Sequence, residues 1–197
     1  MSVREKGALI TWTTGQPDAP PVVLLHDRYL DHEANDALAS RLAPTSRVVS
    51  VRSARTQMES GLVKGYYWHL GPLDEPEMST IGDALSHLER LLIELNRETG
   101  RRIALVGTGE GGSVALLMSL IWRELISGVA SIDGPLAGNL NDMPVDLQPA
   151  AGLPVMLIER RAALASSSIT LAARGASVRI GVASDESLVR WVTNLPA

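Results

Sequence analysis

The residues with the clearest chemical potential form a glycine-rich turn, Gly107-Thr108-Gly109-Glu110-Gly111-Gly112, which lies between an apolar run and a helical run. Two kinds of site use a turn of this type. One is the nucleophile elbow G-x-S-x-G, in which a central serine attacks a carbonyl carbon, and Gly109 holds that central position here. The other is the dinucleotide cradle G-x-G-x-x-G, which Gly107, Gly109 and Gly112 match.

The dinucleotide interpretation has one further point in its favour. Asp133 ends the next predicted strand, 21 positions after Gly112, close to where an acid binds the ribose of such cofactors. However, the cradle normally opens on the first strand of its fold, whereas the strands near residues 21–26 and 48–51 and two helices precede this turn. The position of the turn in the chain therefore favours the elbow.

The elements that must position the turn follow from the hydrophobic pattern. Continuous apolar runs predict buried strands, and apolar residues at helical spacing predict helices. Residues 53–78, which contain several glycines and prolines, are predicted to be irregular. Strands and helices alternate from residue 20 onward, which predicts one α/β domain over residues 1–197 with helices on both faces of its sheet. Strands are expected near residues 8–12, 21–26, 48–51, 103–106, 129–132, 154–158 and 178–182, and helices near residues 32–42, 80–99, 114–126, 162–173 and 184–191.

Composition excludes several classes of protein. The chain has 197 residues, a formal net charge of -4 and no cysteine. The absence of a basic stripe argues against nucleic-acid binding, and no apolar stretch approaches the ~18 residues that a membrane-spanning helix needs. The cysteine-free sequence fits a reducing compartment, so we expect a cytoplasmic location. We also expect no cofactor and no metal, because His26 and His32 form no recognisable ligand pair.

Several segments together give a family resemblance. The span from Pro20 to Trp191 resembles the carboxylesterase and phospholipase branch of the α/β-hydrolase superfamily. The resemblance implies a single-domain, three-layer sandwich with a mostly parallel sheet. It rests first on an apolar strand that ends in a histidine, Leu24-Leu25-His26-Asp27, and on an aromatic loop, Tyr66-Tyr67-Trp68-His69. The elbow at Gly107–Gly112 follows, and then a Pro-Val strand at Pro154–Leu157 and a closing helix with Val189-Arg190-Trp191.

The catalytic triad that the resemblance implies is degenerate. The family places serine, an acid and histidine in that order along the chain. Gly109 has no side chain with which to form an acyl-enzyme. The strand at 154–158 runs directly into Glu159–Ala162, so the loop that should carry the acid looks deleted, and the next acid is Asp185. No histidine follows His87.

Some parts of an esterase site are nevertheless present. The N–H of Glu110, at a helix N-terminus, is predicted to donate to an anion or a carbonyl oxygen, and the loop carrying Asp27 and Arg28 is expected to supply a second donor. His26 and Glu110 are the acid–base candidates. Each has a structural alternative: His26 shapes the loop backbone, and Glu110 complements the helix dipole.

The aromatic loop is expected either to form a pocket wall or to pack in the core; its residues are Tyr66, Tyr67, Trp68 and His69. Ser113 follows the elbow and is expected to be a packed small residue rather than a displaced nucleophile. Ser166, Ser167 and Ser168 are predicted on a helix surface. His32 and His87 are predicted on solvated helix faces.

Three hypotheses of function remain open. The first is a non-catalytic descendant of an esterase that binds a small carbonyl or carboxylate compound, or acts as a partner in a homo- or hetero-oligomer. The second is an enzyme of altered, non-covalent acid–base chemistry in the old pocket. The third is a residual carboxylesterase that uses another nucleophile. The fold alone does not choose among them.

Overall fold

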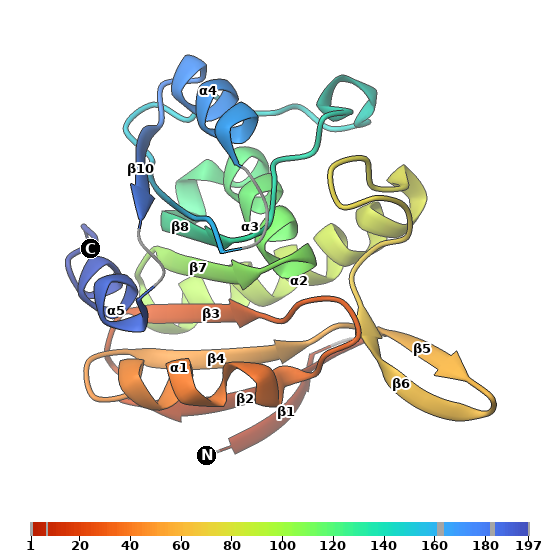
Figure 1. Cartoon of the computed structure of the whole chain (residues 1–197). Helices are drawn as coiled ribbons and strands as arrows, with labels where there is room; N and C mark the ends of the chain where they lie inside the picture. The colour runs from red at the N-terminus through yellow and green to blue at the C-terminus, as the bar shows by residue number, and fades with distance from the viewer. Residues whose placement is uncertain (1, 7, 161–163, 182–183, 197) are drawn as a thin grey trace.

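Eight strands form one sheet in the order β1-β2-β4-β3-β7-β8-β9-β10 (Figure 1). The computed structural model describes residues 2–6, 8–160, 164–181 and 184–196. The β1–β2 and β2–β4 pairs are antiparallel, and the other neighbours are parallel. The strands are β1 (Ser2–Lys6), β2 (Leu9–Gly15), β3 (Pro21–Leu25), β4 (Arg47–Arg52), β7 (Ile103–Thr108), β8 (Ile126–Ile132), β9 (Pro154–Ile158) and β10 (Ser177–Gly181).

Helices cover both faces of this sheet, which confirms the predicted three-layer α/β sandwich (Figure 1). One face carries α1 (Asp36–Leu42) and α5 (Asp185–Thr193); the other carries α2 (Met78–Thr99), α3 (Glu110–Ile121) and α4 (Ala165–Ala173). Short 3-10 helices are η1 (His32–Asn35), η2 (Arg123–Leu125) and η3 (Leu140–Asp142). None of the helices formed by the described residues is long and apolar enough to cross a membrane.

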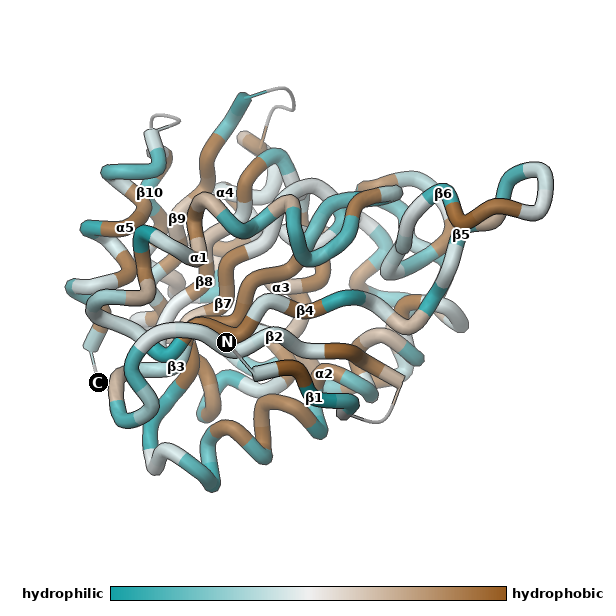
Figure 2. The backbone as a smooth tube through the Cα atoms, turned by 90° about the horizontal axis from the view of Figure 1, so that it is seen from below, coloured by the Kyte–Doolittle hydropathy of each residue, from teal (hydrophilic) through white to brown (hydrophobic). Residues whose placement is uncertain are grey.

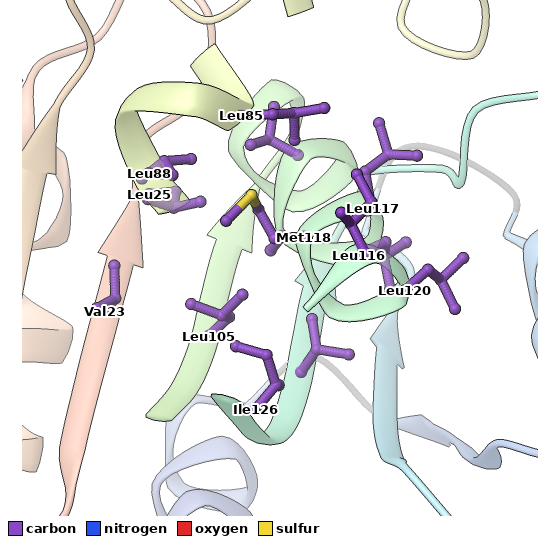
Figure 3. Packing of buried hydrophobic residues seen from close by; sticks show 14 of the residues in the cluster. Val23, Leu25, Leu85, Leu88, Leu105, Leu116, Leu117, Met118, Leu120 and Ile126 are labelled. Atoms are coloured by element: carbon purple, nitrogen blue, oxygen red, sulfur yellow. The ribbon is translucent and has the colours of Figure 1, made fainter. Parts of the chain in front are cut away.

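The larger core lies between the sheet and helices α2 and α3 (Figure 3). Leu88 from α2 and Met118 from α3 belong to the same buried cluster as Leu105 from β7. Every residue of α3 is buried, since its sequence after Glu110 is apolar or small on all sides. This packing fixes the N-terminus of α3, and therefore the glycine-rich turn, in the centre of the molecule.

The segment 53–78 is more regular than its composition predicts. It contains a hairpin of β5 (Arg55–Glu59) and β6 (Leu62–Tyr67), which projects from the body of the molecule (Figures 1 and 2). Ser60 and Gly61 form its turn, and both have positive φ, 52° and 80°, as a two-residue hairpin turn of type I′ requires. The expectation of an irregular segment was wrong because a Ser-Gly turn between two short strands was overlooked.

The loop before α2 is tied to the first turn of that helix. Thr80 Oγ1 donates to the carbonyl of Glu77 and accepts a bond of 2.9 Å from the N–H of Leu70. The helix begins at Met78, two residues earlier than predicted, and Thr80 in its first turn holds the end of the aromatic loop in place.

Candidate functional site

The glycine-rich turn joins β7 to α3 in the middle of the sheet. Gly109 has φ 51° and ψ -118°. Glycine adopts this combination without strain, whereas any other residue at a nucleophile elbow adopts it at a cost in backbone strain. Its N–H donates to the carbonyl of Ile132 at the end of β8 (2.7 Å). The turn is thus a tight strand-to-helix connection at the carboxyl edge of the sheet.

Strand β3 brings a second polar segment to the same edge. It lies parallel to β7, with Leu25 opposite Gly107. Because parallel strands end at the same edge, the residues after β3, His26-Asp27-Arg28, lie beside Gly109 and Glu110. Together with Trp68, these residues make up the candidate site: His26, Asp27, Arg28, Trp68, Gly109 and Glu110.

The side chain of Asp27 lies against the backbone of the glycine-rich turn. Its Oδ1 accepts hydrogen bonds from the N–H of Glu110 (3.0 Å) and from its neighbour Arg28 (2.8 Å). A Cβ added to Gly109 would lie 1.8 Å from Oδ1 and 2.2 Å from Cγ of Asp27. The Asp27 carboxylate therefore takes both of the backbone donors expected for an oxyanion, and also the volume of any side chain at position 109.

Glu110 and Arg28 form an ion pair beside this carboxylate. The Nε of Arg28 donates to Oε1 of Glu110, whose side chain is fully buried, while that of Arg28 is 32% exposed. Oε2 of Glu110 accepts from the backbone N–H of Trp68 (2.9 Å). The Nη2 of Arg28 donates to the carbonyls of His69 (3.1 Å) and Gly71 (2.9 Å). The ion pair thus fastens the aromatic loop to the elbow.

His26 is used entirely within the fold. Its Nε2 accepts from the N–H of Ser53 (3.1 Å), so that nitrogen carries no proton. The proton is therefore on Nδ1, which donates to the carbonyl of Asp27 (2.8 Å). Burial lowers the pKa of His26 below its ordinary value, and the bond to Asp27 opposes this effect only in part. A buried, neutral imidazole with both nitrogens bonded has no free position from which to take a substrate proton.

The aromatic loop is mostly interior. Trp68 is 1% exposed, and its Nε1 donates to the carbonyl of His26 (2.8 Å). His69 is fully buried, and burial lowers its pKa. The guanidinium of Arg52 stacks on Tyr66, 4.6 Å from the ring centroid. Of the two expectations for this loop, core packing describes Trp68 and His69.

Other candidate side chains also have structural roles. Ser113 is fully buried behind the elbow, with its Oγ 3.4 Å from the carbonyl of Gly109. The predicted surface position is wrong for Ser167, which is buried. Its Oγ faces the interior and accepts a hydrogen bond from the N–H of Leu136 (2.8 Å). His32 is likewise not solvated; its ring stacks on Trp12 with a centroid distance of 3.3 Å, and His87 is half-buried on α2.

The acids near the carboxyl edge of the sheet are engaged as well. Oε1 of Glu159 accepts from the N–H of Leu164 (2.7 Å), and Oδ1 of Asp133 accepts from the N–H of Arg160 (2.6 Å). Asp185 pairs with Arg160, and residues 161–163, which include Ala162 and part of the loop expected to be shortened, lie outside the described part of the chain. Asp133 thus binds the backbone of the loop after β9, and this contact differs from the ribose contact of the dinucleotide interpretation. No group of three histidine, aspartate or glutamate side chains suited to a metal occurs among the described residues.

Comparisons with known proteins support the fold. No family model and no curated protein matches the sequence. Among solved structures, the chain is similar to a carboxylesterase from Mesorhizobium loti (16% identity, TM-score 0.71, 98% of each chain covered) and to esterase PE8 (19%, 0.72, 93% of this chain and 97% of that one). It is also similar to YahD solved with malic acid (17%, 0.70, 94% and 98%). The chain therefore has the α/β-hydrolase fold that the sequence resemblance implies, with carboxylesterases among its structural neighbours.

Proposed function

We propose that this protein is a non-catalytic binding protein on a carboxylesterase scaffold. The observation that carries the proposal is the position of Asp27, whose carboxylate fills the space of a nucleophile at Gly109 and accepts from both backbone donors. In an esterase those donors stabilise the negative charge that develops on the substrate oxygen. Donors already bound to a carboxylate do not serve that purpose, and a negative charge at this place repels an oxyanion.

The alternative of altered acid–base chemistry has less support. A general base needs hydrogen-bond access to the proton that it removes. His26 has both nitrogens bonded within the fold, and Glu110 is fully buried with each carboxylate oxygen bonded. A residual esterase with another nucleophile has equally little support, because Ser113 is buried and packed.

A small carboxylate ligand at the elbow is a second candidate function, and one observation favours it. Asp27 is itself a carboxylate held by two backbone N–H groups at the start of a helix, so the site has the donors that recognise this chemical group. An external carboxylate must displace Asp27 to bind there. YahD, a structural neighbour, was solved with malic acid, which carries such groups.

The decisive experiment measures hydrolysis and labelling of the purified protein. We expect no saturable turnover of p-nitrophenyl acetate or butyrate and no covalent labelling by a fluorophosphonate probe. A working serine esterase of the same fold, assayed in parallel, serves as the positive control. Saturable turnover together with labelling of a single serine would show that the proposal is wrong.

A further inference from the structure

The β5–β6 hairpin has a strand edge without a partner. The hairpin stands clear of the body of the molecule (Figures 1 and 2), and β5 pairs with β6 alone among the described strands. A two-stranded hairpin is at best marginally stable in water, and an unpaired edge is a template for a further strand. Strand β5 contributes no residue to the candidate site, so the inference below does not rest on the proposed function.

The free edge belongs to β5, because β6 is paired on its other side at the root of the hairpin. The N–H of Tyr29 donates to the carbonyl of Tyr66 (2.8 Å), and the N–H of Tyr66 donates to the carbonyl of Leu30 (3.2 Å). The backbone of Tyr66 therefore faces away from β5. Thr56 lies opposite Tyr66, so the two form a non-hydrogen-bonded pair, and the N–H and C=O of Thr56 point away from β6.

Met58 presents its backbone groups on the same edge, because their direction alternates along a strand. Within the described part of the chain, these groups of Thr56 and Met58 make one hydrogen bond, of 3.3 Å, from the side-chain amide of Gln57 to the carbonyl of Met58. The edge thus offers donors and acceptors two residues apart, which is the spacing that an antiparallel strand pairs with.

The sequence of β5 is complementary to itself in the antiparallel direction. The strand reads Arg55-Thr56-Gln57-Met58-Glu59. When two copies pair about a two-fold axis at Gln57, Arg55 of each copy lies opposite Glu59 of the other. Thr56 then lies opposite Met58, and each outward N–H of one copy meets an outward carbonyl of the other.

The charges select this register. Two-fold axes at Thr56 or at Met58 also align outward backbone groups, but they do not place Arg55 opposite Glu59. Opposite charges directly across a strand pair are stabilising, and like charges are destabilising. The axis at Gln57 is therefore the favoured one.

The new ion pairs extend pairs that each copy already has. Arg55 contacts Asp83, and Lys64 lies 2.8 Å from Glu59. Side chains of alternating charge would then run across the interface, in the order Asp83, Arg55, Glu59 and Lys64, with the last two from the second copy. Such a network contributes more than an isolated surface pair.

The other face of the hairpin carries exposed apolar side chains. Met58 is 51% exposed and lies opposite Val63, which is 56% exposed. In the paired arrangement Met58 also lies beside Thr56 of the second copy, so part of this apolar surface becomes buried. We propose that β5 is the interface of a symmetric dimer, in which two copies of this chain join their hairpins edge to edge into a four-stranded antiparallel sheet.

Sedimentation equilibrium of the purified full chain tests the proposal. We expect a weak dimer, with a dissociation constant on the order of tens of micromolar, since one short strand buries less than a standard interface. A chain that stays monomeric up to about 500 µM would overturn the proposal, because the edge would then be solvated or kept for another protein.

Charge reversal tests the register. Arg55→Glu and Glu59→Arg each place like charges opposite each other in a homodimer, so each variant alone should associate at least about tenfold more weakly than the wild type. A mixture of the two variants has opposite charges at both positions, and it should form a heterodimer at least about tenfold tighter than either homodimer. Recovery in the mixture also shows that both variants fold. A mixture that associates no better than its components would contradict the register.

A second pair of variants tests the backbone edge. Thr56→Pro removes an outward N–H, and proline is tolerated where that group faces solvent, so the hairpin should persist while dimerisation is lost. Thr56→Val is the matched control, since it keeps both the N–H and the branched shape, and it should dimerise like the wild type. Equal association of these two variants would place the dimer interface elsewhere and overturn the proposal.

Discussion

The carboxylate of Asp27 and the α-carbon of Gly109 exclude any side chain between them, since a Cβ on residue 109 would lie 1.8 Å from Oδ1. The family that the sequence resembles has a glycine after the histidine of the first motif and a serine at the elbow. This chain has Asp27 and Gly109 at those positions. The side chain that fills this space at the edge of the sheet thus belongs to the segment after β3 and not to the elbow.

The first prediction concerns this shared space. Gly109→Ala should destabilise the fold by roughly 3 kcal/mol or more, because it adds backbone strain to an overlap with Asp27. Gly100→Ala is the matched control: Gly100 also has positive φ (63°) but nothing within 4 Å of an added Cβ, so about 1 kcal/mol is expected. Urea unfolding of Asp27→Gly, Gly109→Ala and the double variant should give a favourable coupling energy of about 1–3 kcal/mol. Equal effects of the two alanine substitutions would contradict the overlap.

The second prediction is that Asp27→Gly creates a binding site for carboxylates. The substitution releases the N–H groups of Arg28 and Glu110, which then lack an acceptor. Malate or acetate should raise the melting temperature of this variant, with an affinity at least about tenfold higher than that of the wild type. Asp27→Asn keeps an oxygen in place and should behave like the wild type. If malate stabilises all three proteins equally, the ligand binds elsewhere.

The third prediction is an asymmetry within the ion pair. Arg28→Leu leaves the fully buried Glu110 carboxylate without its counterion, which should cost about 3–5 kcal/mol. Glu110→Gln should cost less, about 1–3 kcal/mol, since the amide oxygen still accepts from Trp68 and the partly exposed guanidinium of Arg28 reaches water. Chemical denaturation measures both values.

The control for this pair is an ion pair nearer the surface. Glu98, which pairs with Arg47, is about one-third exposed, and Glu98→Gln should change the free energy of unfolding by no more than about 1 kcal/mol. An Arg28→Leu variant that is no less stable than Glu98→Gln would show that Glu110 is not held as a buried anion.

The fourth prediction concerns pH. Burial lowers the pKa of His26 and of His69, so below about pH 6.5 the unfolded chain binds protons that the folded chain does not. Stability should therefore be complete above pH 7 and fall as the pH drops from 6.5 toward the folded-state pKa values. Each histidine contributes a slope of up to about 1.4 kcal/mol per pH unit.

Urea unfolding between pH 7.5 and 5.5 measures this slope. His69→Asn retains a donor for the carbonyl of Leu70 and removes the titrating ring, so its slope should be about half that of the wild type. A slope that is unchanged in His69→Asn would mean that other groups cause the pH dependence.

The sheet and its helices were predictable from sequence because their signals are local. The apolar run Ile103–Val106 followed by glycines indicates a buried strand and a tight turn, and the alternation of elements indicates the fold class. The structure confirms the predicted helices on both faces of the sheet. The β5–β6 hairpin was missed because its strands are short, exposed and rich in polar residues, so their periodicity is weak.

The contents of the candidate site were harder to predict, because they depend on pairs that are distant in the chain. Asp27 and Glu110 are 83 positions apart, and no spacing rule connects them. The available signal was the joint departure from the family pattern at Asp27 and Gly109, which becomes meaningful only when both residues are placed at one edge of the sheet. The buried position of His32 was unpredictable for the same reason, since the ring that covers it, Trp12, comes from the distant strand β2.

The occupied elbow also limits the order in which mutations could introduce a serine at position 109. If Gly109→Ser occurs first, the new side chain overlaps the carboxylate of Asp27, and the intermediate protein is destabilised. If Asp27 is replaced by a smaller residue first, the turn stays intact and its backbone donors become accessible, so a serine can then be introduced without an overlap. The outcome therefore depends on the order of the two changes, and an evolving population could acquire a serine at this position only after the elbow had been emptied.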